Sequence, residues 1–145
     1  MKHEEKKIFR IVVLEDSEFF NDVLTRQLEA YTSQLAMEKN CSFDIQSYTS
    51  PVDFMRNLKS DTDIAFVDYY LGNGITGEDV LKKIKQRCRD CKVIIMSQAK
   101  NVKTAAIAVN ESVMDFIFKD MDALSRSCFL VEDIVIARLL PHQNN

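Results

Sequence analysis

The chain alternates between short apolar runs and longer stretches with helical spacing. The runs are rich in β-branched and aromatic residues and occupy residues 8–14, 43–48, 64–67, 93–96 and 113–118. Three of them contain the continuous apolar segments IVVL, IAFV and VIIM, which are typical of strands buried on both faces of a parallel sheet. The second run alternates apolar and polar residues, which predicts a half-exposed edge strand.

Between the runs, apolar residues recur at the spacing of a helix face. The first such face carries Phe20, Leu24, Leu28, Tyr31 and Leu35. Pro51 suits the first turn of a short helix that extends through Leu58, because its missing N–H is not needed there. Three further helices are expected on Val80, Leu81 and Ile84, on Val102, Ala105, Ala106 and Val109, and on Leu124, Cys128, Val131, Val135 and Leu139.

This order repeats a strand and a helix five times. Such a repeat predicts a doubly wound α/β fold, in which right-handed crossovers place helices on both faces of a five-stranded parallel sheet. The 145 residues fit one domain, 1–145, with a core from about residue 8 to about residue 140. Only residues 141–145 follow the expected last helix, so we expect no output domain such as a DNA-binding module.

Composition excludes several classes of protein. No run approaches the roughly 20 apolar residues that cross a bilayer, and the charged start MKHEEKKIFR has no signal core, so we expect a cytoplasmic protein without membrane contact. A formal charge of −3 disfavours a direct nucleic-acid surface. The four cysteines are expected to be reduced. Cys88 and Cys91 form a CxxC, but no second pair lies nearby to complete a zinc site, so they are interpreted as plain thiols.

Polar side chains follow four of the five expected strands. In an open parallel sheet, ligands bind beyond the carboxyl ends of the strands, so these side chains are expected to converge. Any one of them could merely cap a strand or helix, as Ser17 or Asp16 could cap the first helix. The convergent set is Glu15 and Asp16 after the first strand, Asp68 after the third, Ser97 after the fourth and Lys119 after the fifth.

The charges of this set indicate a divalent cation. Three carboxylates carry −3 and Lys119 returns +1, so a divalent ion brings the sum to zero. Buried carboxylates are costly unless they are paired or bind a metal. Hard carboxylate oxygens suit Mg²⁺, which keeps several water ligands.

With these residues the chain resembles the CheY-like receiver domains of response regulators in two-component signalling. The resemblance covers nearly the whole length and implies the flavodoxin-like strand order 2-1-3-4-5. The motifs that carry it are Val13-Leu14-Glu15-Asp16, Phe66-Val67-Asp68-Tyr69-Tyr70-Leu71, Ile95-Met96-Ser97-Gln98 and Phe116-Ile117-Phe118-Lys119.

The resemblance also implies a role for each site residue. Asp68 would be the phosphoacceptor for a sensor histidine kinase or a histidine phosphotransfer protein. The Mg²⁺ ligands would be Glu15, Asp16, Asp68 and the main-chain carbonyl of Tyr70. Ser97 and Lys119 would contact the phosphoryl group. Phe116 would be the aromatic switch, which turns inward into the space that Ser97 leaves when it moves toward the phosphoryl group.

The chain departs from the family pattern at three positions. Glu15 stands where many members have Asp, and its carboxylate should still bind metal. Gln98 replaces a common small residue and would narrow the access to Asp68. Asp120 replaces the usual proline after Lys119, which leaves open whether the Lys119–Asp120 bond is cis and where the ammonium lies.

The last helix carries a second apolar stripe opposite its expected core face. A contiguous apolar patch on a single domain marks an interface, so this stripe predicts a homodimer or a partner contact. Local packing of the side chains is the alternative. The stripe consists of Phe129, Ile136 and Leu140.

We therefore expect a signalling domain that is phosphorylated, and not an enzyme. The only chemistry of this domain would be its own phosphorylation and dephosphorylation. The alternative is a pseudo-receiver that only binds partners. An aspartyl phosphatase is disfavoured because Tyr70 stands where a general-acid Asp would be needed. The sequence leaves open whether the chain is a stand-alone regulator or part of a longer regulator or hybrid kinase.

Overall fold

The computed structural model describes residues 5–99 and 113–141. All five expected strands are present within one or two residues of their expected bounds, whereas the expected helix around 102–109 lies outside the described residues. The elements are β1 (Ile8–Leu14), α1 (Glu18–Lys39), β2 (Ser42–Tyr48), α2 (Pro51–Asn57), β3 (Ile64–Asp68), α3 (Gly77–Arg87), β4 (Lys92–Ser97), β5 (Val113–Phe118) and α5 (Ala123–Leu139).

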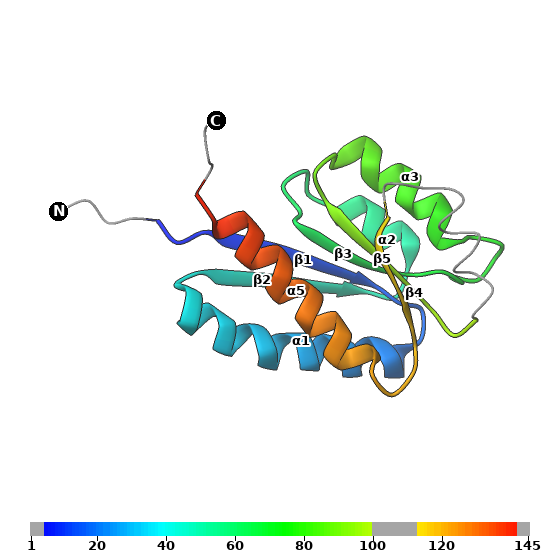
Figure 1. Cartoon of the computed structure of the whole chain (residues 1–145). Helices are drawn as coiled ribbons and strands as arrows, with labels where there is room; N and C mark the ends of the chain where they lie inside the picture. Colours follow the sequence, from blue (N-terminus) through cyan, green and yellow to red (C-terminus); the bar gives the residue numbers. More distant parts are fainter. Residues whose placement is uncertain (1–4, 100–112, 142–145) are drawn as a thin grey trace.

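The strands form one parallel sheet in the order β2-β1-β3-β4-β5. Figure 1 shows α1 and α5 side by side on one face of the sheet and α2 and α3 on the other. The doubly wound α/β fold and its strand order are therefore confirmed. β2 lies at an edge and most of its residues are half-buried, as its alternating sequence predicted.

Each face of the sheet has its own hydrophobic core. Successive residues of a strand point to opposite faces, so β1 contributes Ile11 and Val13 to the core under α1 and α5. The same strand contributes Val12 and Leu14 to the core under α2 and α3. Because β1, β3 and β4 supply both cores, their sequences are apolar at almost every position.

The two helices that follow β1 and β2 each begin at a serine cap. Ser17 is the N-cap of α1, and its hydroxyl accepts a hydrogen bond from the Phe20 N–H at 3.3 Å. Pro51 occupies the first turn of α2, as predicted, after the N-cap Ser50. These caps fix where the chain leaves the carboxyl ends of β1 and β2.

The last turn of α5 differs from the expectation. Leu139 was expected in the core but is 38% exposed, and the buried face of the helix runs through Ala123, Ser127, Val131 and Ile134. Continued by one turn, that face reaches Arg138, whose Nη1 lies 2.5 Å from Oδ1 of the buried Asp63. Leu139 is displaced because this ion pair occupies the inward position.

Asp63 connects three elements at the amino ends of the strands. Its Oδ2 accepts a hydrogen bond from the backbone N–H of Arg10 at 2.9 Å. Nη2 of Arg138 also donates to the carbonyl of Asp90, at 2.7 Å. The C-terminal end of α5 is thereby fixed to β1 and to the chain just before β3.

The four cysteines are free, as expected, and the structure shows in addition that all four are buried. The Cys88 thiol lies against the Thr62 carbonyl at 3.1 Å, and burial raises the pKa of the Cys91 thiol to about 12. A thiol that stays protonated at neutral pH is a weak nucleophile, which agrees with the interpretation of this CxxC as plain thiols.

Among the described residues, no helix combines the length and the apolar character that crossing a membrane requires.

A buried asparagine fixes α1 to the sheet. Asn21 Nδ2 donates to the carbonyl of Glu15 at 3.1 Å and to that of Tyr48 at 2.9 Å. Both carbonyls lie at the carboxyl edge, one after β1 and the other at the end of β2. The side chain thus donates to one carbonyl at the end of each strand, and the Tyr48 carbonyl also accepts from the Glu15 N–H.

Replacing Asn21 by Ala should destabilise the fold by about 1–3 kcal/mol, because the Glu15 carbonyl loses its side-chain donor and the Tyr48 carbonyl loses one of its two donors. The free energy of unfolding in urea measures the change. Asp22→Ala, at an exposed position on the same turn, is the matched control and should cost less than about 0.5 kcal/mol. Equal losses in the two variants would contradict the role of Asn21.

Candidate functional site

The two acidic residues after β1 occupy different environments. Glu15 is buried, its backbone N–H donates to the Tyr48 carbonyl at 3.0 Å, and its Oε1 accepts from the Ser17 N–H at 3.2 Å. Asp16 is exposed at the rim. The capped start of α1 therefore holds the Glu15 carboxylate inside the edge of the sheet and leaves that of Asp16 facing solvent.

Asp68 ends β3 and is buried. The chain returns close to its backbone at Gly77, whose N–H donates to the Tyr69 carbonyl at 2.7 Å. A Cβ at Gly77 would lie 3.1 Å from the Asp68 carbonyl oxygen and 3.1 Å from Tyr69 Cα. Glycine is required there because the start of α3 passes directly against the residue that ends β3.

Lys119 follows β5 and brings its ammonium between two of the carboxylates. Its Nζ lies 2.6 Å from Glu15 Oε2 and 3.1 Å from Asp68 Oδ1, and its side chain is only 7% exposed. No cis peptide bond occurs among the described residues, so the Lys119–Asp120 bond is trans. The position of the ammonium, which the missing proline left open, is therefore settled without a cis bond.

The carboxylates of Glu15, Asp16 and Asp68 converge as predicted. One oxygen from each lies within 4.8 Å of the others. Glu15 Oε2 is fully buried, and among the described residues its charge partner is the Lys119 ammonium at 2.6 Å. Three carboxylates that share one ammonium still carry excess negative charge, and their hard oxygens are suitable ligands for a divalent cation.

Burial makes Asp68 hard to ionise. Loss of hydration is the largest cause, the nearby charge of Glu15 is the second, and together they raise the pKa of Asp68 to about 7. The ammonium of Lys119 acts in the opposite direction but does not cancel them. The site therefore has an excess of negative charge that one lysine cannot neutralise.

Ser97 and Phe116 lie where β4 and β5 approach this edge. Ser97 is fully buried, and its hydroxyl accepts from the Ala99 N–H at 3.1 Å. The ring of Phe116 is buried, with its centroid 5.5 Å from that of Phe118. The ring is therefore buried in this structure, and the role of Phe116 as a switch stays a prediction.

The remaining predicted residues are exposed. Tyr70 is exposed beside Tyr69, and the role of its main-chain carbonyl as a metal ligand stays a prediction. The stripe of Phe129, Ile136 and Leu140 is exposed on α5, as predicted, although Phe129 also touches the ring of Tyr31, at 6.4 Å between centroids. Dimerisation through this stripe stays a prediction.

One residue of the site was not predicted as such. Phe20 was expected only as part of the core face of α1, yet its ring centroid lies 4.7 Å from Lys119 Nζ. Helical spacing reports which face of a helix is apolar but not which charged group lies against its first turn. The spacing therefore contained no signal for this contact.

Comparison with known proteins agrees with this geometry. The family model described as response regulator receiver domain matches residues 11–125. The chain belongs to this family. No protein in a search of curated sequences matches this receiver domain.

Solved structures share the fold at low sequence identity. A response regulator receiver domain protein from Clostridium thermocellum has a TM-score of 0.68 and 17% identity, over 90% of this chain and 96% of that one. The non-phosphorylated HemR receiver domain from Leptospira biflexa has a TM-score of 0.69 and 16% identity, over 94% and 99%. TrrA from Thermotoga maritima, in complex with Mg²⁺-BeF, has a TM-score of 0.69 and 16% identity, over 87% and 98%.

The raised pKa of Asp68 predicts that this residue destabilises the metal-free receiver domain at neutral pH. The unfolded chain releases the proton near 3.8 and the folded chain near 7, so stability falls as the pH rises through that interval. Asp68→Asn should therefore be the more stable protein by about 1–2 kcal/mol at pH 8, since solvent at the site screens part of the repulsion.

Urea unfolding in EDTA at a series of pH values measures this difference. The free energy of unfolding of Asp68→Asn, relative to that of the wild type, should increase as the pH rises from 4 to 7 and then level off. Asp133→Asn, which changes an exposed carboxylate on α5, should follow the wild-type profile. A stability difference between Asp68→Asn and wild type that does not change with pH would contradict the raised pKa of Asp68.

Proposed function

We propose that this receiver domain accepts a phosphoryl group on Asp68 from a sensor histidine kinase or a histidine phosphotransfer protein, in a reaction that depends on Mg²⁺. The proposal rests on one observation above all, the convergence of a buried acceptor carboxylate, two further carboxylates and a lysine ammonium at one sheet edge. The protein would be a signalling domain that changes its own state, not an enzyme that turns over a separate substrate.

The residues of the acidic cluster fit a magnesium ion. Glu15, Asp16 and Asp68 would hold it, since one carboxylate oxygen from each lies within 4.8 Å of the others. One divalent charge would offset the −2 that remains after Lys119 is counted against the three carboxylates. When bound, the ion would neutralise charge that develops on the phosphoryl oxygens.

The chemistry proposed for Asp68 is an in-line displacement. A carboxylate oxygen of Asp68 attacks phosphorus, the phosphorus–nitrogen bond of a phosphohistidine breaks, and the imidazole leaves with a proton from solvent. The product is an acyl phosphate on Asp68. The Lys119 ammonium, 3.1 Å from the acceptor oxygen, lies close enough to interact with the incoming oxygens.

Phosphorylation would then change the surface that partners contact. It replaces one carboxylate charge by about −1.5 to −2, which attracts hydrogen-bond donors. The Ser97 hydroxyl accepts from Ala99 and still has a hydrogen to donate toward a phosphoryl oxygen. Movement of Ser97 would alter the space beside Phe116 and shift the population between two arrangements of β5.

The exposed stripe on α5 would be one such surface. Phe129, Ile136 and Leu140 present apolar side chains to solvent, and burial of apolar area favours association. We propose that a second copy of the chain or a downstream protein contacts it, while nucleic acid and membrane are not expected to bind directly. A cytoplasmic location is part of the same proposal.

Incubation with phosphoramidate and Mg²⁺ should produce a single phosphoryl adduct that mass spectrometry assigns to the peptide containing Asp68. Asp68→Asn should form none. Asp61→Asn, which changes an exposed carboxylate outside the site, should be modified like the wild type. An unmodified wild-type protein would contradict the proposal and favour the pseudo-receiver.

Magnesium should stabilise the wild-type protein. At a concentration ten times the dissociation constant, binding to the folded state alone contributes about 1.4 kcal/mol, which raises Tm by about 3–6 °C. Asp16→Asn should lose most of this increase, whereas Asp53→Asn, at an exposed position on α2, should keep it. Thermal unfolding with Mg²⁺ or EDTA measures the effect, and equal midpoints for wild type in the two buffers would count against the metal site.

A further inference from the structure

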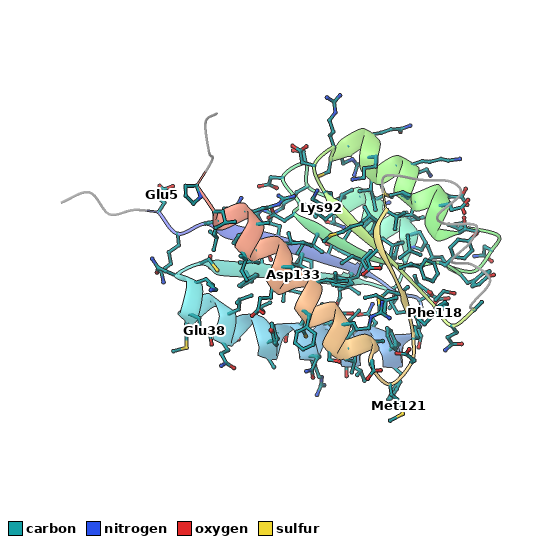
Figure 2. The ribbon with its side chains drawn as sticks, in the orientation of Figure 1. Glu5, Glu38, Lys92, Phe118, Met121 and Asp133 are labelled. Atoms are coloured by element: carbon teal, nitrogen blue, oxygen red, sulfur yellow. The ribbon has the colours of Figure 1, made fainter. Side chains whose placement is uncertain are left out.

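The ammonium of Lys119 has a third neighbour besides its two carboxylates. The ring of Phe20 lies against it, with 4.7 Å between Nζ and the ring centroid. Lys119 stands between Phe118 at the end of β5 and the loop that leads to α5. Figure 2 shows Phe118 at this edge of the sheet and Met121 projecting away from it into solvent. The ammonium is therefore enclosed by Glu15, Asp68 and the ring, and its side chain is almost completely buried.

The attraction of the ammonium to the two carboxylates depends on charge in the site, whereas its attraction to the ring does not. Attraction to Glu15 and Asp68 depends on their negative charges, which a bound cation would offset and phosphorylation of Asp68 would redistribute. Attraction to the face of an aromatic ring comes from the ring quadrupole, which no titration or metal removes. Phe20 is therefore the neighbour whose hold on the ammonium does not depend on the charge of the carboxylates.

The position of Phe20 is itself well fixed. Its N–H is the donor to the N-cap Ser17 at the start of α1, and the next residue, Asn21, binds two carbonyls at the edge of the sheet. Its ring packs against the core under α1 and α5. By contrast, lysine has a flexible four-carbon side chain that gains from a rigid neighbour.

We propose that Phe20 is a positioning residue, which holds the Lys119 ammonium at the phosphoacceptor through its aromatic face; the effect on phosphotransfer rests on the function proposed above. The ring need not touch the phosphoryl group to act. It restricts where the ammonium lies while the charges around it change. Aromatic character is the required property, beyond apolar volume alone.

The test separates aromatic character from volume. Phe20→Leu keeps an apolar side chain without a ring, and Phe20→Tyr keeps the ring. With phosphoramidate at saturating Mg²⁺, Phe20→Leu should form the Asp68 adduct about threefold to thirtyfold more slowly, the range that a cation–π contact of partly to fully buried groups predicts. Phe20→Tyr should restore most of the rate.

A matched control lies one position away. Phe19 is 79% exposed in the same helical turn, so Phe19→Leu makes the same chemical change without removing the contact. It should react within twofold of the wild type. Adduct formation by Phe20→Leu at the wild-type rate would overturn the proposal, and equal slowing in Phe20→Leu and Phe20→Tyr would replace it with a packing role.

A second measurement does not depend on phosphotransfer. The ring current of Phe20 should shift the ε-methylene protons of Lys119 upfield in a ¹H–¹³C NMR spectrum of the unmodified protein. The shift should disappear in Phe20→Leu and persist in Phe20→Tyr and Phe19→Leu. If the wild type forms no adduct but shows this shift, the proposed function fails while the contact stands, whereas a wild-type Lys119 signal without the shift overturns the contact itself.

Discussion

The site depends on one balance, between the repulsion of buried carboxylates and the single ammonium placed among them. Glu15 and Asp68 lie in a region with little water, where like charges repel strongly. Lys119 is in contact with both, at 2.6 Å and 3.1 Å, yet Asp68 still ionises with difficulty. A site left with this excess of negative charge attracts a cation, and it offers an incoming anion an ammonium that is already in place.

The parallel sheet creates this balance by bringing distant segments to one edge. Residues 15, 68 and 119 meet only because β1, β3 and β5 all point the same way. Local contacts then set the distances. Asn21 fixes the start of α1 to the ends of β1 and β2, and Gly77 allows the start of α3 to pass against the end of β3. The site is therefore built by strand direction and adjusted by hydrogen bonds and close packing.

The sequence was most informative where burial constrains every residue of a segment. Runs such as IVVL and VIIM predicted central strands because a strand buried on both faces admits few polar residues, and the residue after each run then indicated the edge. Periodicity was uninformative where a single contact decides the outcome. Leu139 matched the apolar spacing of the last helix, but Arg138 takes the inward position because Asp63 lies beneath it. The contact of Phe20 with Lys119 likewise joins two segments that are distant in the sequence.

The ion pair of Arg138 with Asp63 has a mechanical consequence for α5. It anchors the helix at its C-terminal end, far along the chain from Lys119. The opposite end begins at Asp122, whose side chain makes no capping hydrogen bond, three residues after Lys119. This near end is held by the packing of Ala123 and Cys128 into the core, whereas the far end is fixed by a directional ion pair, so the helix can pivot about the far end. A small displacement of the loop after β5 would thus move the near end of α5 through a larger arc than its far end, and within the exposed apolar stripe Phe129 would travel further than Leu140.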